Sequence, residues 1–297
     1  MTSAPSSLTA TTDADARRLL AQIDARATAH DAEHEGVRVR WRRFGPDSAT
    51  LPPLVLLHGG HGSWMHWLRN IEALSADRAL WLPDMPGFHD SGVPPAPAAD
   101  DAAIDPMLCA LGGTLDTLIG AGTVIDLGGF SFGGLTAAQF AARRGAVRRI
   151  GLLGSGGHGT LRRMTVQMIN WRAAPDREAE IAALHHNLGA LMLHDAAAID
   201  ALAFAIHDIS CHGTRFRSKE VSLAGGLQAA LATHDGPQLL VWGEYDVTAD
   251  PRPLVAGLAA GHPRRRAVVV DGAGHWVQYE RAEETNRLLR DFFGAPD

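Results

Sequence analysis

Residues 124–133 read VIDLGGFSFG, an apolar run that ends in the pattern Gly129-x-Ser131-x-Gly133. Residues 135–144, an Ala-rich segment with helical spacing, follow directly. The apolar run predicts a buried strand, and the glycines leave room for a sharp turn in which a Cβ atom would clash. The pattern therefore predicts a strand, a tight turn that exposes the Ser131 hydroxyl, and a helix whose positive end lies beside that hydroxyl.

Short apolar runs recur on both sides of this element. Residues 37–42 alternate Val or Trp with Arg, the period-two pattern of a half-exposed strand. Runs typical of buried strands occur at 54–57, 79–82, 150–153, 239–242 and 267–270. Helical patterns occupy 107–119 and 283–293. Strands that alternate with helices indicate an α/β protein with a mostly parallel central sheet and helices on both faces.

The pattern changes between residues 156 and 235. This segment lacks short apolar runs and is rich in Ala, Leu, His and Met with helical spacing. We expect it to be a helical cap inserted into a core made of residues 36–155 and 236–297. Residues 1–35 are expected to be an N-terminal extension that is partly helical, with a weakly amphipathic helix over 13–30.

The composition is that of a globular protein, because 46% of the 297 residues are hydrophobic and 20% are charged. A formal net charge of −6 gives no reason to expect a nucleic acid or an anionic membrane as partner. The N-terminal residues lack the pattern of a secretory signal, and no stretch reaches the roughly 18–20 apolar residues that cross a bilayer. We therefore expect a cytoplasmic protein, with Cys109 and Cys211 as reduced thiols.

A serine hydroxyl needs a neighbouring base to act as a nucleophile at neutral pH. Of the fifteen histidines, His275 lies in a Gly-rich turn directly after the predicted strand 267–270. Asp246 follows the predicted strand 239–242 by one short turn, so we expect its carboxylate at the same edge of the sheet. The order Ser, acid, His predicts Ser131 as the nucleophile, His275 as the general base and Asp246 as the acid that orients the base.

Two further features of the loops concern the same chemistry. Asp250 precedes Pro251 and is expected to cap the next helix rather than to orient the base. Acyl transfer also needs backbone N–H groups aimed at the oxyanion of the tetrahedral intermediate. We expect these donors to be the N–H of Phe132, which follows the nucleophile, and the N–H of Gly60, in the turn after residues 54–57.

Five motifs appear in the order of the α/β-hydrolase family, which the chain resembles from about residue 36 to 295. They are His58-Gly59-Gly60, the segment 84–88 (DMPGF), the elbow at Ser131, the Gly243-x-x-Asp246 turn and the Gly274-His275 turn. The resemblance implies the family's α/β fold and hydrolysis through a Ser-His-Asp triad. A serine at 131 argues against the haloalkane dehalogenases and epoxide hydrolases, which use Asp there.

The chain also resembles the meta-cleavage-product hydrolases, which split a carbon–carbon bond in vinylogous diketo acids. Trp64, 69–71 (RNI), 86–88 (PGF), 154–157 (GSGG) and His275-Trp276 carry this resemblance. That family usually has Asn before the nucleophile and a longer glycine-rich oxyanion loop, whereas this chain has Phe130 and the short loop 59–63.

Four residues are expected to contact the substrate. The resemblance implies a cap arginine for the substrate carboxylate, and Arg215 and Arg217 are available for this role. Phe130 offers a carboxylate no hydrogen bond, so burial of that group against its ring would be costly. Trp276, beside the predicted base, packs either on substrate or on the core.

These features predict an enzyme that forms an acyl-enzyme with a small, largely apolar molecule. A carboxylic ester is the first choice, because Phe130 favours neutral acyl chains. Carbon–carbon cleavage of the meta-cleavage-product type is the second, and a cofactor-free perhydrolase or haloperoxidase would use the same triad. A non-catalytic small-molecule receptor is the alternative from a different class.

We expect neither a cofactor nor a metal. The cap is rich in histidine but lacks Cys or acidic partners at zinc-like spacing. The histidines concerned are His185, His186, His194, His207 and His212. The sequence leaves the oligomeric state open, a homo-oligomer included.

Overall fold

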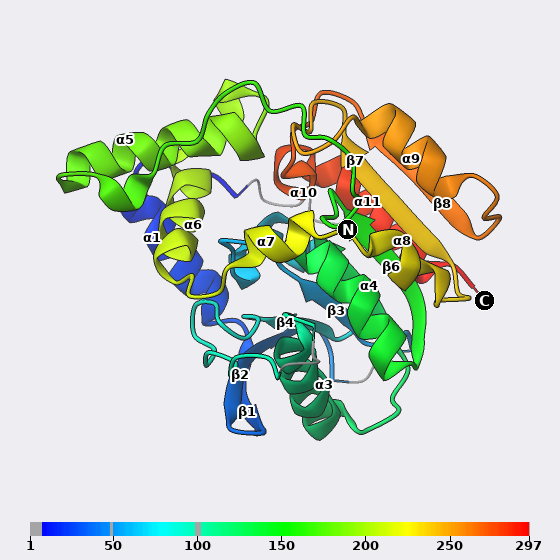
Figure 1. Cartoon of the computed structure of the whole chain (residues 1–297). Helices are drawn as coiled ribbons and strands as arrows, with labels where there is room; N and C mark the ends of the chain where they lie inside the picture. Colours follow the sequence, from blue (N-terminus) through cyan, green and yellow to red (C-terminus); the bar gives the residue numbers. More distant parts are fainter. Residues whose placement is uncertain (1–7, 48–49, 99–101, 297) are drawn as a thin grey trace, which may run out of the picture.

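The computed structural model of the chain describes residues 8–47, 50–98 and 102–296. Its strands are β1 (Thr28–His34), β2 (Val37–Phe44), β3 (Leu54–Leu57), β4 (Leu80–Pro83), β5 (Ile125–Phe130), β6 (Val147–Leu153), β7 (Gln238–Gly243) and β8 (Arg265–Val270). They form one sheet in the order β1-β2-β4-β3-β5-β6-β7-β8 (Figure 1). β2 runs antiparallel to β1 and to β4, and all other neighbours are parallel. The predicted α/β fold with a mostly parallel sheet is therefore confirmed.

Helices cover both faces of the sheet, as buried parallel strands require. In β3, Val55 and Leu57 belong to a core cluster on one face, together with residues of α3 (Asp105–Ile119), α4 (Phe132–Arg144), α8 (Leu227–Ala232) and α9 (Pro251–Ala259). Leu54 and Leu56 belong to a second cluster on the other face, with η1 (Trp64–Asn70), α2 (Ile71–Leu74), α10 (Val277–Glu280) and α11 (Ala282–Gly294). Successive side chains of one short strand thus enter two separate cores.

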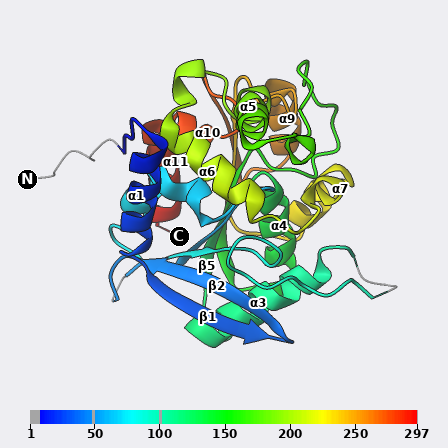
Figure 2. The same ribbon diagram turned by 90° about the vertical axis from the view of Figure 1, so that its left-hand side faces the viewer.

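Residues 154–237 lie between β6 and β7 and add no strand to the sheet. They contain η2 (Trp171–Ala173), α5 (Arg177–Asn187), η3 (Leu188–Met192), η4 (Ala196–Ala198), α6 (Ala201–His212), α7 (Ser218–Leu223) and α8. In Figure 2, α5 and α6 lie at the top of the molecule, with α3 and the β1–β2 edge at the bottom. We call residues 156–235 the cap, as in the sequence-based division.

The N-terminal segment differs from its prediction. The predicted helix over 13–30 is shorter, because α1 (Asp13–Asp24) ends before a strand begins at Thr28. β1 pairs along its whole length with β2, so the sheet starts within the segment 1–35 that was expected to be an extension. β1 reads TAHDAEH and buries only Ala32, as an edge strand can, so its sequence carries no apolar alternation.

Two further observations concern the helices. Residues 158–170 form no helix, so the helical spacing expected across the cap is interrupted there. Within the described ranges, no helix combines the length and the apolar character needed to span a membrane.

Candidate active site

Ser131 occupies the turn between α4 and β5, an inner strand of the sheet. Its backbone has φ +54°, in the left-handed region that non-glycine residues rarely adopt. Neighbouring loops hold this conformation: the Ser131 N–H donates to Leu153 O at 2.9 Å, and Ser131 O accepts from Gly156 N at 2.9 Å. A Cβ atom at Gly129 would lie 2.1 Å from Gly133 O, so the turn excludes larger residues at Gly129.

The structure brings His275 and Asp246 to this serine. His275 Nε2 lies 2.9 Å from Ser131 Oγ, and His275 Nδ1 lies 2.8 Å from Asp246 Oδ2. Both residues lie in the loops that follow β8 and β7, at the sheet edge where β5 also ends. Gly154 packs beneath the pair, since a Cβ there would lie 3.0 Å from His275 Nδ1 and 3.2 Å from Asp246 Oδ2.

Asp246 is a buried carboxylate with both oxygens occupied. Its Oδ1 accepts hydrogen bonds from the Thr248 N–H at 2.8 Å and from the Thr248 hydroxyl at 2.7 Å. Burial alone would raise the pKa of Asp246, but His275 and the two bonds from Thr248 outweigh it and hold that pKa below its ordinary value. Asp246 is therefore an anion at neutral pH, turned toward the imidazole.

Asp250 lies apart from this arrangement. It stands at the N-cap position of α9, but its side chain makes no capping hydrogen bond. It lies 3.4 Å from Arg163 instead. Asp250 therefore occupies the predicted N-cap position, but its side chain accepts no capping bond; Pro253, at the third position of the helix, has no N–H to donate.

Phe132 and Gly60, the two residues whose backbone amides are expected to bind an oxyanion, lie close to each other. Phe132 is the first residue of α4, so its N–H has no partner within that helix. Gly60 approaches it closely: a Cβ on Gly60 would lie 3.7 Å from the Phe132 Cβ. The same Cβ would lie 2.3 Å from the Ser218 hydroxyl of the cap, which explains the need for glycine. The two residues are thus neighbours, and their role in binding an oxyanion stays a prediction.

His58 fixes the orientation of the Gly59–Gly60 peptide. The Met85 N–H donates to His58 Nε2 at 2.9 Å, so the proton of the neutral ring is on Nδ1, which lies 2.8 Å from Gly59 O. Burial lowers the pKa of His58 to about 4, which keeps the ring neutral. Because C=O and N–H point in opposite directions in a trans peptide, holding Gly59 O directs the Gly60 N–H the other way.

A cavity of about 110 Å³ adjoins Ser131 and His275. Most of its other walls are glycine backbone and polar side chains of the cap and the acid loop. The side chains are His158, Thr160, Arg162, Ser222, Leu223 and Thr248. Arg162 is the single Lys or Arg among them, and it is exposed. The cavity is therefore more polar than the apolar pocket that the sequence suggested.

The residues predicted to contact the substrate lie elsewhere. Phe130 and Trp276 are fully buried and belong to the core. The Phe130 ring lies beneath His275, with 5.0 Å between ring centroids, and Trp276 stacks on Tyr279 at 4.3 Å. Neither lines the cavity, and Trp276 packs on the core, the second of its two expected environments. As the last residue of β5, Phe130 points into the core, while the turn directs only Ser131 outward.

Arg215 and Arg217 do not line the cavity either. Arg215 donates to three backbone carbonyls, those of Gly213, His89 and Ser91. It therefore connects the chain after α6 to the loop after β4. Arg217 precedes α7 and is exposed. The arginine that lines the cavity is Arg162, in the irregular stretch 158–170, where no periodic pattern marks it.

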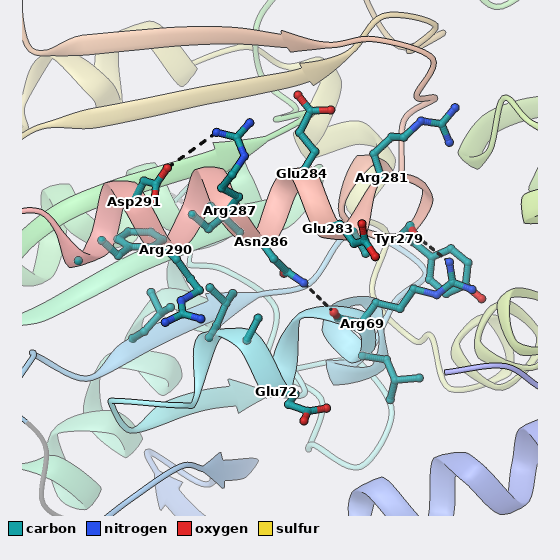
Figure 3. Close-up of a pocket in the computed structure, with 18 of the residues that line it drawn as sticks. Arg69, Glu72, Tyr279, Arg281, Glu283, Glu284, Asn286, Arg287, Arg290 and Asp291 are labelled. Carbon is teal, nitrogen blue, oxygen red and sulfur yellow. Dashed lines mark hydrogen bonds and ion pairs between the residues drawn. The ribbon is translucent and has the colours of Figure 1, made fainter. Parts of the chain in front are cut away.

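A much larger cleft, of about 1040 Å³, lies between η1, α2 and α11 (Figure 3). It shares no lining residue with the cavity at Ser131. Its walls hold many charged side chains; Arg287 lies 3.9 Å from Asp291, and Asn286 Nδ2 donates to Arg69 O at 3.0 Å.

Two clusters in the described part of the chain could offer three ligands to a metal ion, and neither includes a residue of the cavity. The first is His34, Glu35 and Cys109, and the second is Asp84, His89 and Asp90. In the second, the Arg42 guanidinium already lies 2.8 Å from Asp84 and 2.6 Å from Asp90, where a cation would have to bind.

Comparison with known proteins supports the same fold class. Residues 52–282 match a family described as the alpha/beta hydrolase fold. A 2-hydroxy-6-oxononadienedioate/2-hydroxy-6-oxononatrienedioate hydrolase of Pseudomonas putida is 31% identical over 285 residues, covering 86% of this chain and 91% of that protein. The dihydrolipoyllysine-residue acetyltransferase component of an acetoin cleaving system, also from Pseudomonas putida, is 30% identical, covering 88% of this chain and 68% of that protein.

Solved structures share the fold at lower identity. The esterase RhEst1 from Rhodococcus sp. ECU1013 superposes with a TM-score of 0.73 at 23% identity, covering 90% of this chain and 99% of the esterase. At this identity the likeness concerns the fold.

Proposed function

This chain belongs to the α/β-hydrolase fold family, and on that premise we propose that it hydrolyses small carbonyl compounds through an acyl-enzyme formed on Ser131. His275 Nε2 accepts the Ser131 proton as Oγ attacks the carbonyl carbon. The Phe132 and Gly60 N–H groups receive the negative charge on the carbonyl oxygen. The imidazolium then protonates the leaving group, and water enters by the same steps to release the acid.

One observation carries this proposal: the unbroken chain from Ser131 Oγ through the His275 ring to Asp246, with contacts of 2.9 and 2.8 Å. Each ring nitrogen has one role in it. Asp246 keeps the proton on Nδ1, which leaves Nε2 free to accept the serine proton. The fixed backbone amides beside it supply charge stabilisation that needs no rearrangement during the reaction.

Labelling with a fluorophosphonate tests the proposal without a known substrate. The reagent should label the wild-type protein, and Ser131→Ala should lose the label and lower any hydrolytic rate by about 10⁴-fold or more. Ser75→Ala is the control, because Ser75 lies at the end of α2 and lines neither the cavity nor the cleft. Labelling that persists in Ser131→Ala would remove Ser131 from the mechanism. Absence of labelling in the wild type would favour a non-catalytic receptor.

Two substrate classes fit this chemistry. A carboxylic ester needs only the triad and the two amides. A vinylogous diketo acid also needs a group that binds its carboxylate, and Arg162, which lines the same cavity as Ser131, favours this second candidate. The Pseudomonas putida relative is named for hydrolysis of such a dienedioate. Since Phe130 is buried in the core, its lack of a hydrogen bond no longer argues against an acidic substrate.

Adjacent arginines give a matched test of the two classes. Arg162 lines the cavity, whereas Arg163 pairs with Asp250. If the substrate is a diketo acid, Arg162→Ala should raise its KM by about tenfold or more, since a charged hydrogen bond contributes roughly 1.5–3 kcal/mol, and Arg163→Ala should not. A neutral p-nitrophenyl ester that is hydrolysed faster than a dienoate diketo acid, with equal KM in all three proteins, would instead identify an esterase.

A further inference from the structure

One buried carboxylate, that of Glu280, accepts a backbone hydrogen bond from the turn that carries His275. Glu280 ends the short helix α10 and is 8% exposed. Its Oε2 accepts from the Gly274 N–H at 2.6 Å, and its Oε1 accepts from the His194 N–H at 3.0 Å and the Asp195 N–H at 2.6 Å. Three backbone amides therefore converge on a side chain that the proposed mechanism does not use.

These amides come from two segments that are far apart in the sequence. Gly274 directly precedes His275, whereas His194 and Asp195 belong to the cap, just after η3. The Trp276 N–H also donates to Met192 O at 2.7 Å, on the other side of His275. The histidine turn is thus fixed to the cap both before and after His275.

Close packing supports the same connection. A Cβ on Gly274 would lie 2.7 Å from His194 N and 3.1 Å from the backbone carbon of Leu193. The His194 ring also stacks on Tyr245, with 3.7 Å between centroids and 10° between planes. Tyr245 immediately precedes Asp246, so residues 193–195 of the cap contact both the base turn and the acid turn.

A carboxylate suits this position better than any other acceptor. It has no proton to donate and enough lone pairs for three N–H donors, and hydrogen bonds to a charged acceptor are the stronger kind. An amide in its place would direct an NH₂ group at a backbone N–H and leave that donor buried without a partner.

We propose that Glu280 is a positioning residue that couples the cap to the catalytic base. It holds the turn so that His275 Nε2 faces Ser131 while Nδ1 faces Asp246, and it does so through cap residues 193–195. Glu280 does not line the cavity, so it acts on the reactivity of Ser131 and not on ligand binding. This inference rests on the proposed function.

The rate of fluorophosphonate labelling tests this role. In Glu280→Gln the maximal rate of labelling at saturating reagent should fall roughly ten- to hundredfold, because small displacements of catalytic groups have effects of that size. The concentration for half-maximal rate should stay unchanged, which a general loss of structure would not produce. Glu284→Gln, an exposed residue of α11, is the control and should match the wild type. Equal maximal rates in Glu280→Gln and the wild type, or a change in the half-maximal concentration alone, would overturn the proposal.

Hydrogen exchange of the wild type provides a second test that needs no folded variant. Phosphonylation of Ser131 restrains His275, and through Glu280 it should slow amide exchange in peptides that contain residues 193–195. Unchanged exchange in those peptides would contradict the coupling. A wild type that takes no label contradicts the proposed function itself, so the two failures are distinguishable.

Discussion

At the scale of residues, Thr248 is the closest partner of the triad that sequence reasoning did not single out. Its N–H and hydroxyl both bind Asp246 Oδ1, while Oδ2 of the same carboxylate faces His275. The spacing Asp-x-Thr allows this local bond, but many surface turns have the same spacing. The motif holds the acid of the triad in this protein because Asp246 is buried against His275.

Replacement of the two loop aspartates should separate their roles. Asp246→Asn should lower kcat about 10³–10⁴-fold, because His275 loses the partner that sets its tautomer. Asp250→Asn should change kcat little, since Asp250 pairs with the exposed Arg163. Steady-state kinetics on one ester or diketo acid would measure both, and the reverse ranking would show that the acid is misassigned.

At the scale of elements, buried charges join β2 to the loop after β4. Arg42 lies 2.8 Å from Asp84 and 2.6 Å from Asp90, and His89 Nδ1 lies 3.4 Å from Asp84 and 3.2 Å from Asp90. The His89 N–H donates to Gly213 O at 2.8 Å, just after α6. The loop after β4 therefore contacts the sheet through ion pairs and the cap through a backbone hydrogen bond.

This connection should depend on pH. Burial lowers the pKa of His89, but the nearby carboxylates of Asp84 and Asp90 outweigh it and raise that pKa to about 9. The unfolded value is about 6.5. Protonated His89 therefore stabilises the fold fully below about pH 6.5, and this contribution is lost as the pH rises through about 9.

Urea unfolding of the wild type and His89→Gln between pH 6 and pH 10 would measure this contribution. The excess stability of the wild type should shrink across that range by at most about 3 kcal/mol, at 1.36 kcal/mol per pKa unit. A difference that is constant with pH, or that grows at high pH, would show that His89 is not held protonated by these carboxylates.

At the scale of the whole molecule, the N-terminal helix α1 fastens the cap. α1 and α6 lie side by side in both views (Figures 1 and 2), and the Arg17 guanidinium lies 2.8 Å from Asp208 of α6. Leu20 and Ile23 are buried in the same core cluster as α6. The N-terminal segment is thus an integral part of the fold that supports the cap.

Shortening the Leu20 side chain, which packs in the core cluster shared with α6, should lower the stability of the whole protein. Leu20→Ala should lower the free energy of unfolding by about 2–5 kcal/mol, since Leu20 is 5% exposed. Gln22→Ala, on the exposed side of the same helix, is the control and should change it by about 0.5 kcal/mol or less. Chemical unfolding curves give both values, and equal stability of the two variants would mean that α1 does not support the fold.

The sequence by itself determined the features that local patterns encode. The apolar runs predicted seven of the eight strands, and glycines at fixed positions predicted the turns that hold Ser131, Asp246 and His275. Such signals depend on neighbours within a few residues, so they can be read along the chain. β1 was missed because an edge strand needs little apolar burial, and its pairing with β2 was invisible in its own residues.

The tertiary structure decided which side chains meet. It buried Phe130 and Trp276 in the core and directed Arg215 to backbone carbonyls. It also placed Arg162 in the wall of the cavity at Ser131 and linked the His275 turn to the cap through Glu280. Each of these outcomes depends on segments separated by many tens of residues. Such contacts depend on how whole elements pack against each other. They produce no repeating pattern in the sequence around each residue, so they could not be predicted from it.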